Sequence, residues 1–140
     1  MIQRIQSLWL LLAAACTIAT FKISFFSGNR LNETTNTKEW VEFVATNNTI
    51  VLILTVLVAV AALVAIFMFK DRKRQMLIGI ATGIASIALL FAYLTEEQKF
   101  TEARVDLTSI VHFAIPLLIG LAIRAIYRDE KLVKSADRIR

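Results

Sequence analysis

Long apolar runs alternate with short charged intervals along this chain. Four runs stand out, at residues 5–26, 49–69, 75–95 and 107–123, and Lys22 alone interrupts the first. A helix rises about 1.5 Å per residue and the hydrocarbon core of a bilayer is about 30 Å thick, so about 20 residues cross it. Each run is therefore long enough to predict a membrane-spanning helix.

The same runs are not typical of strands. Strands in globular proteins rarely exceed about 10 residues, and the runs lack the alternation of apolar and polar positions that a membrane barrel requires. In lipid, a helix satisfies every backbone N–H and C=O within its own segment. We therefore predict an all-α, polytopic membrane protein with four transmembrane helices in an up-down bundle.

The resulting organisation is a single membrane domain over residues 1–140. Its predicted parts are spans at about 5–26, 49–69, 75–95 and 107–127, an external loop at 27–48 and a cytoplasmic basic tail at 128–140. Within the external loop, Trp40, Phe43 and Val44 have helical spacing. This spacing predicts either a short amphipathic segment on the outer membrane surface or a plain loop with one buried anchor.

The basic residues indicate the orientation of the spans. Of 16 Lys and Arg residues, eleven lie at the N-terminus, in the link at 70–74 and in the tail from Arg124 onward, and five lie in the other intervals. The positive-inside rule then places both termini in the cytoplasm. Because the basic residues flank the spans, the net charge of +5 favours membrane lipids over nucleic acid as partners.

Composition agrees with this class. Hydrophobic residues make up 57% of the chain and the mean hydropathy is +0.65. Together with the confinement of charges to short intervals between the apolar runs, this disfavours a water-soluble fold. The single cysteine, Cys16, cannot form a disulfide within the chain and is expected to be a buried apolar thiol.

The two ends of the chain have a distinctive sequence. They read MIQRIQSLWLLLAA over residues 1–14 and RAIYRDEKLVKSADRIR over residues 124–140. Together they resemble domain-of-unknown-function family 4293. The resemblance implies a bacterial, four-span, multi-pass protein of the inner membrane, and it carries over no catalytic or binding residue.

The fourth span carries a possible polar stripe. Thr108, His112 and Pro116 recur at a spacing of four and are followed at the same spacing by Gly120 and Arg124. His112 is the only histidine, and an imidazole can change its charge near neutral pH. The stripe, with Thr17, Thr20 and Ser24 in the first span, predicts either a small outward-facing ligand cavity or close packing between helices.

Two further groups of residues suggest contacts. Gly79 and Gly83 form a GxxxG motif that Ser86 extends, which favours close helix packing within the monomer or between two copies. The tail places basic side chains on one side of an amphipathic helix, at Arg128, Lys131, Lys134 and Arg138. They predict contact with anionic lipid headgroups or with a protein partner.

The sequence does not indicate catalysis. It shows no nucleophile with a neighbouring base and no cluster of metal ligands, so we expect no enzyme activity, no metal and no cofactor. We expect a non-catalytic accessory or assembly component of a larger membrane complex, bound to another membrane protein or to copies of itself. The alternative is a small transporter or channel that uses the polar stripe around His112.

Overall fold

The computed structural model describes residues 2–138 and shows a mostly helical molecule. Three helices are long and apolar enough to cross a membrane: Thr49–Phe67 (α2), Arg72–Glu97 (α3) and Ser109–Asp137 (α4). Helix α1, Ile2–Ala19, contains a shorter apolar stretch, Ile5–Ala19. The predicted helical fold is confirmed for most of the chain, and the length and apolar character of these three helices agree with a membrane protein.

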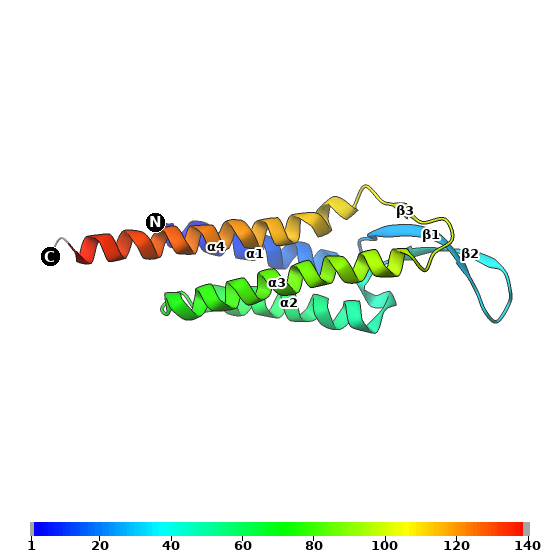
Figure 1. The fold of residues 1–140 in the computed structure, drawn as a ribbon, viewed down its shortest axis with the longest axis horizontal. Coiled ribbons are helices and arrows are strands. Elements are labelled where there is room, and N and C mark those ends of the chain that lie inside the picture. The colour runs from blue at the N-terminus through cyan, green and yellow to red at the C-terminus, as the bar shows by residue number, and fades with distance from the viewer. Residues whose placement is uncertain (1, 139–140) are drawn as a thin grey trace.

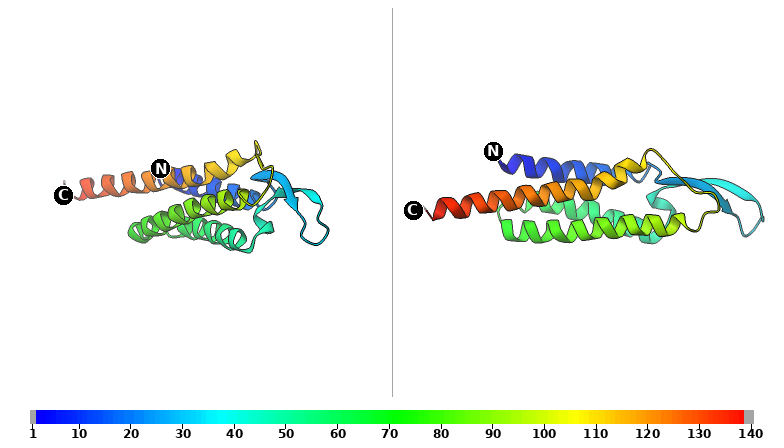
Figure 2. Two further views of the ribbon diagram at one scale, coloured as in Figure 1. Left: turned by 45° about the vertical axis from the view of Figure 1, so that its right-hand side comes forward. Right: turned by 45° about the horizontal axis from the view of Figure 1, so that its top comes forward.

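The four helices lie side by side as a bundle (Figure 1). Each helix packs against its neighbour in sequence, and α4 closes the bundle against α1. Both ends of the chain and the α2–α3 link lie at one end of the bundle, and the strands lie at the other (Figures 1 and 2). The basic segments of the chain are thus gathered at one end.

A small antiparallel sheet replaces most of the predicted external loop. Phe26–Leu31 (β1) pairs with Lys38–Phe43 (β2) and with Arg104–Val105 (β3), in the order β2-β1-β3. The prediction of an all-α fold was wrong in this region, as was the amphipathic segment with helical spacing. The physical reason is alternation along β2, where Val41 and Phe43 turn inward while Trp40 and Glu42 stay exposed.

The first predicted span, residues 5–26, was too long. Helix α1 ends at Ala19, and a turn follows in which the Ile23 N–H donates to the Ala19 carbonyl at 3.0 Å. The chain is then extended, and the Phe25 N–H donates to the Phe43 carbonyl at 3.0 Å. Phe25 and Phe26 are fully buried where the sheet meets the helices. Their apolar side chains therefore belong to this contact and do not extend the helix.

Local sequence sets the ends of the two central helices. Asn48 caps α2 by accepting from the Ile50 and Val51 N–H groups, and Asp71 caps α3 by accepting from the Arg74 N–H. Helix α4 passes through Pro116 without ending and continues to Asp137. The predicted fourth span and most of the tail are therefore one continuous helix, while residues 139–140 of that tail lie outside the described residues.

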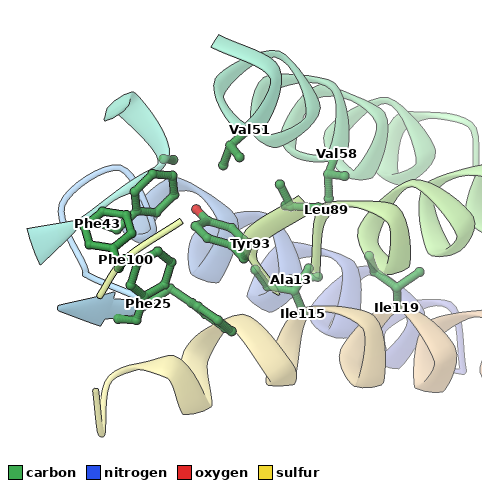
Figure 3. Packing of buried hydrophobic residues seen from close by; sticks show 12 residues of the cluster. Ala13, Phe25, Phe43, Val51, Val58, Leu89, Tyr93, Phe100, Ile115 and Ile119 are labelled. Atoms are coloured by element: carbon green, nitrogen blue, oxygen red, sulfur yellow. The ribbon is translucent and has the colours of Figure 1, made fainter. Parts of the chain in front are cut away.

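The bundle places its small residues inside and many large apolar residues outside. The buried side of α2 carries Ala59, Ala62 and Ala65, whereas Ile53 and Phe67 are 60% and 77% exposed. Figure 3 shows the interior layer formed by Val58, Leu89, Ile115 and Ile119. Such a long exposed apolar surface is unfavourable in water but matches hydrocarbon, so the distribution supports a membrane protein.

Candidate functional site

Aromatic side chains join the sheet to the helices at the end of the bundle opposite the α2–α3 link. We call this group the aromatic cap: Phe25, Phe26, Phe43, Tyr93, Phe100 and His112. Phe26 stacks on Phe43 at 4.8 Å between ring centroids, and Phe25 stacks on Tyr93 at 4.9 Å. Most of these rings are visible in Figure 3. The cap holds the strands firmly on α3 and α4.

His112 is the ring that α4 contributes to this cap. Its side chain is 1% exposed, and its ring stands edge-on to Tyr93 and Phe25, with centroids at 4.8 and 5.0 Å. Although the Thr108 backbone lies beside the imidazole, neither ring nitrogen makes a well-directed hydrogen bond to a described residue. An unpaired buried polar group costs about 1–3 kcal/mol, which makes His112 a candidate functional residue.

Tyr93 is the residue at this site that the sequence did not reveal. Its ring is fully buried, and its hydroxyl lies beside those of Thr20 and Thr55 without a well-directed hydrogen bond. Both threonines donate their own hydrogens to backbone carbonyls, to Thr17 at 2.6 Å and to Val51 at 2.7 Å. Helices α2, α3 and α4 and the turn after α1 thus bring one imidazole and three hydroxyls to the same end of the core.

The other members of the predicted stripe do not join His112 in a cavity. Thr108 is exposed and donates to the Ser24 carbonyl at 2.8 Å. Pro116 is half-buried, and Gly120 and Arg124 are exposed. A spacing of four drifts around a helix that has 3.6 residues per turn, so the stripe leaves the core after His112.

An apolar layer lies beneath the His112 site. Ala13, Val58, Leu89, Ile115 and Ile119 are all buried there. Polar groups are buried again near the other end of the bundle, where the Gln75 side-chain amide donates to the Ala65 carbonyl at 3.0 Å. The buried polar side chains of α3 between these two regions, Thr82 and Ser86, both donate their hydroxyl hydrogens to carbonyls of their own helix, to Ile78 and to Gly83, each at 2.7 Å.

Asp106 fixes the junction between the sheet and α4. Its carboxylate accepts from the Ser24 hydroxyl at 2.5 Å and from the Ser27 hydroxyl at 2.6 Å. Its backbone N–H donates to the Phe25 carbonyl at 3.2 Å. These contacts join residues about 80 positions apart in the sequence.

The predicted GxxxG residues lie on the surface of α3 that faces α4. A β-carbon built on Gly79 would lie 3.3 Å from Cγ1 of Ile123, and one on Gly83 would lie 3.6 Å from side-chain atoms of Ile119 and Ile123. Ser86 is buried and donates to the Gly83 carbonyl at 2.7 Å. These small residues allow the two helices of one chain to approach closely.

The predicted basic contact residues are on the far end of α4. Arg128, Lys131, Lys134 and Arg138 are all exposed, and Lys134 pairs with Glu130 at 2.7 Å. Beside them, Asp129 is 8% exposed and pairs with Arg72 at 3.4 Å, which joins the start of α3 to α4. Sequence spacing did not predict this ion pair because its members come from different helices.

The hairpin of β1 and β2 leaves one strand edge open. Strand β2 is at the edge of the sheet, and the Asn32 N–H donates to the Thr37 carbonyl at 3.1 Å. By antiparallel alternation, the backbone groups of Glu39 and Val41 then face β1, and those of Trp40 face the open edge. The Trp40 side chain is 58% exposed.

Comparison with known proteins gives a single assignment. A family model described as domain of unknown function (DUF4293) matches residues 2–139. No curated protein and no solved structure matches the chain. Within residues 2–138, no group of three His, Cys, Asp or Glu side chains is arranged to hold a metal ion.

Proposed function

The chain belongs to the DUF4293 family, whose description assigns no activity, and we propose that it is a non-catalytic, multi-pass protein of the bacterial inner membrane. In this proposal all four helices cross the membrane, both termini are cytoplasmic, and the protein is an accessory or assembly component of a larger membrane complex. The open edge of β2 with the exposed Trp40 carries the proposal.

The hairpin is well suited to bind an extended segment of a partner protein. Its outer edge presents the backbone groups of Lys38, Trp40 and Glu42, which can add a partner strand to the sheet. Trp40 supplies the large aromatic surface that is enriched at binding hot spots. The aromatic cap and Asp106 hold the hairpin rigidly on the bundle, so little conformational entropy is lost on binding.

Photocrosslinking in living cells tests this contact. We would introduce a benzophenone amino acid at position 40 and, as a control, at the outward-facing position of Ile53, which is 60% exposed on α2. We expect position 40 to give one crosslinked product of constant added mass, which the control position does not give. Crosslinks only to lipid, or only to a second copy, would contradict binding to another protein.

A proline substitution separates backbone pairing from side-chain contact. Glu42→Pro removes an N–H that points away from β1, so the internal sheet is retained while the open edge is blocked. Glu42→Gln alters only the side chain and is the matched control. We expect the crosslink at position 40 to be lost with proline and kept with glutamine, whereas equal yields would exclude strand addition.

The unpaired nitrogens of His112 favour a second candidate, a small proton-coupled transporter. A buried imidazole without a well-directed hydrogen bond to a described residue, packed edge-on against the Tyr93 ring, can accept and release a proton. The apolar layer beneath the site opposes this function, because a transporter requires a polar route through the bundle. Proton flux into liposomes that is lost in His112→Ala would support transport, and equal flux in both proteins would exclude it.

A further inference from the structure

A groove lies between α1 and α4 near the end of the bundle that holds both termini. Its volume is about 290 Å³, and its lining combines apolar side chains with two guanidinium groups. The lining residues are Ile5, Trp9, Leu121, Arg124, Ala125 and Arg128. The two arginines are one helical turn apart and lie on the same side of α4.

Neither arginine has an anionic partner among the described residues. The two nearest acidic residues in the sequence are engaged elsewhere, since Asp129 pairs with Arg72 at 3.4 Å and Glu130 pairs with Lys134 at 2.7 Å. Arg124 and Arg128 are exposed. Two positive charges therefore face the groove without compensation from these carboxylates.

The groove is at the level where lipid headgroups begin. Arg124 directly follows the uncharged run at residues 107–123, so its guanidinium marks the boundary of the apolar surface. Trp9 of α1 lies in the same groove and is a residue type enriched at this boundary. Ile5 and Leu121 supply apolar surface beside the charges, as a bound acyl chain would require.

We propose that this groove binds an anionic phospholipid. Arg124 and Arg128 bind the phosphate, because a guanidinium matches two phosphate oxygens with parallel N–H donors. Trp9, Ile5 and Leu121 contact the glycerol and the first part of the acyl chains. A zwitterionic lipid is disfavoured because its ammonium group would lie near two positive charges, and free phosphate would leave the apolar lining unused.

Tryptophan fluorescence gives a direct measure of occupancy. The chain contains two tryptophans, Trp9 and Trp40, so Trp40→Phe leaves one fluorophore, in the groove. We would reconstitute this protein into vesicles of phosphatidylcholine and phosphatidylglycerol in which one lipid at a time has brominated acyl chains that quench tryptophan. We expect brominated phosphatidylglycerol to quench Trp9 more than its mole fraction predicts, and equal quenching by the two lipids would overturn the proposal.

Charge-matched variants distinguish the groove from a general surface effect. Each basic residue near an anionic surface contributes about fivefold in affinity, so Arg124→Gln with Arg128→Gln should abolish the preference for phosphatidylglycerol. Lys70→Gln with Lys73→Gln removes the same charge from the α2–α3 link and should preserve the preference. An equal loss in both proteins would overturn a specific site.

Two further measurements complete the test. Arg128→Lys keeps the charge but loses the planar donor group, so it should bind phosphatidylglycerol more weakly than the unsubstituted protein while still preferring it over phosphatidylcholine. This single substitution also keeps the proposal testable where the double substitution impairs folding. Unchanged preference in Arg128→Lys would contradict binding through the guanidinium fork. Millimolar inorganic phosphate should leave the quenching unchanged, and reversal by phosphate would show an anion site in place of a lipid site.

Discussion

At the scale of single residues, the structure shows why a particular residue type is required at positions where the sequence does not indicate the requirement. Gly28 of β1 is such a position, because β3 and the residues before it pass closely across it. A β-carbon there would lie 3.0 Å from both the Ala103 α-carbon and the Glu102 carbonyl oxygen. These are backbone atoms and cannot rotate away, so this glycine permits the close approach of two chain segments.

We therefore expect Gly28→Ala to lower the free energy of unfolding by about 1–3 kcal/mol, the usual cost of forcing an added group into a packed site. Gly120→Ala is the control, since nothing lies within 4 Å of its added β-carbon and alanine favours helix by about 1 kcal/mol. Reversible unfolding in detergent micelles measures both. Equal effects of the two substitutions would contradict the close contact at Gly28.

The residues of the candidate site also differ in how far sequence could identify them. His112 stood out because it is the only histidine and lies in an apolar run. Tyr93 did not, because its two polar neighbours, Thr20 and Thr55, come from the turn after α1 and from α2. Asp106 was likewise missed, since its partners Ser24 and Ser27 lie far away in the sequence.

At the scale of elements, the contact between α3 and α4 depends on small residues. Gly79 lies against Ile123 within the same chain, so a larger side chain should separate these helices. We expect Gly79→Leu to destabilise the protein by about 1–3 kcal/mol without changing its oligomeric state. Ala81→Leu, at an exposed position of α3, is the control.

Chemical unfolding and light scattering in detergent distinguish packing of the GxxxG motif within one chain from contact between two copies. If Gly79→Leu instead dissociated an oligomer and left monomer stability unchanged, the motif would join two copies. Sequence could not decide between these outcomes, because GxxxG specifies that a helix surface is small and does not specify which helix covers it.

The Arg72–Asp129 pair couples two further elements, the start of α3 and the end of α4. Its side chains are 27% and 12% exposed, so solvent screens the interaction only in part. A double-mutant cycle with Arg72→Gln and Asp129→Asn should give a coupling energy of about 1 kcal/mol, larger than for a fully exposed pair. A coupling near zero would show that the pair does not join these helices in solution.

At the scale of the whole molecule, the bundle has two chemically different ends. The basic residues of the α2–α3 link and of the tail share one end with both termini, and the sheet extends from the other (Figure 1). The exposed apolar surface of the helices lies between them. This arrangement matches a protein that crosses a bilayer with its sheet on the outer side.

Cysteine labelling tests this orientation. In a Cys16→Ala background we would place one cysteine at a time at Thr35, in the hairpin turn, or at Ser135, which is exposed near the end of α4. A maleimide that cannot cross the inner membrane should label Thr35→Cys in intact cells whose outer membrane has been made permeable to it. It should label Ser135→Cys only after the inner membrane is opened. The reverse pattern would invert the proposed topology.

Sequence by itself determined which segments are apolar helices and which ends of them carry positive charge. Both depend on properties local to the chain, namely run length, helix caps such as Asn48 and Asp71, and the distribution of Lys and Arg. The family assignment also came from local sequence, in the two ends of the chain, and the match over residues 2–139 confirms it.

Tertiary structure alone decided the features that depend on distant residues. The sheet is held together by Phe26, which packs against Phe43 and Phe100, and by β1, which pairs with both β2 and β3. The His112 site, the Arg72–Asp129 pair and the groove at Arg124 likewise combine side chains from different helices. Periodicity specifies which side of a helix is buried, but only packing specifies what that side meets.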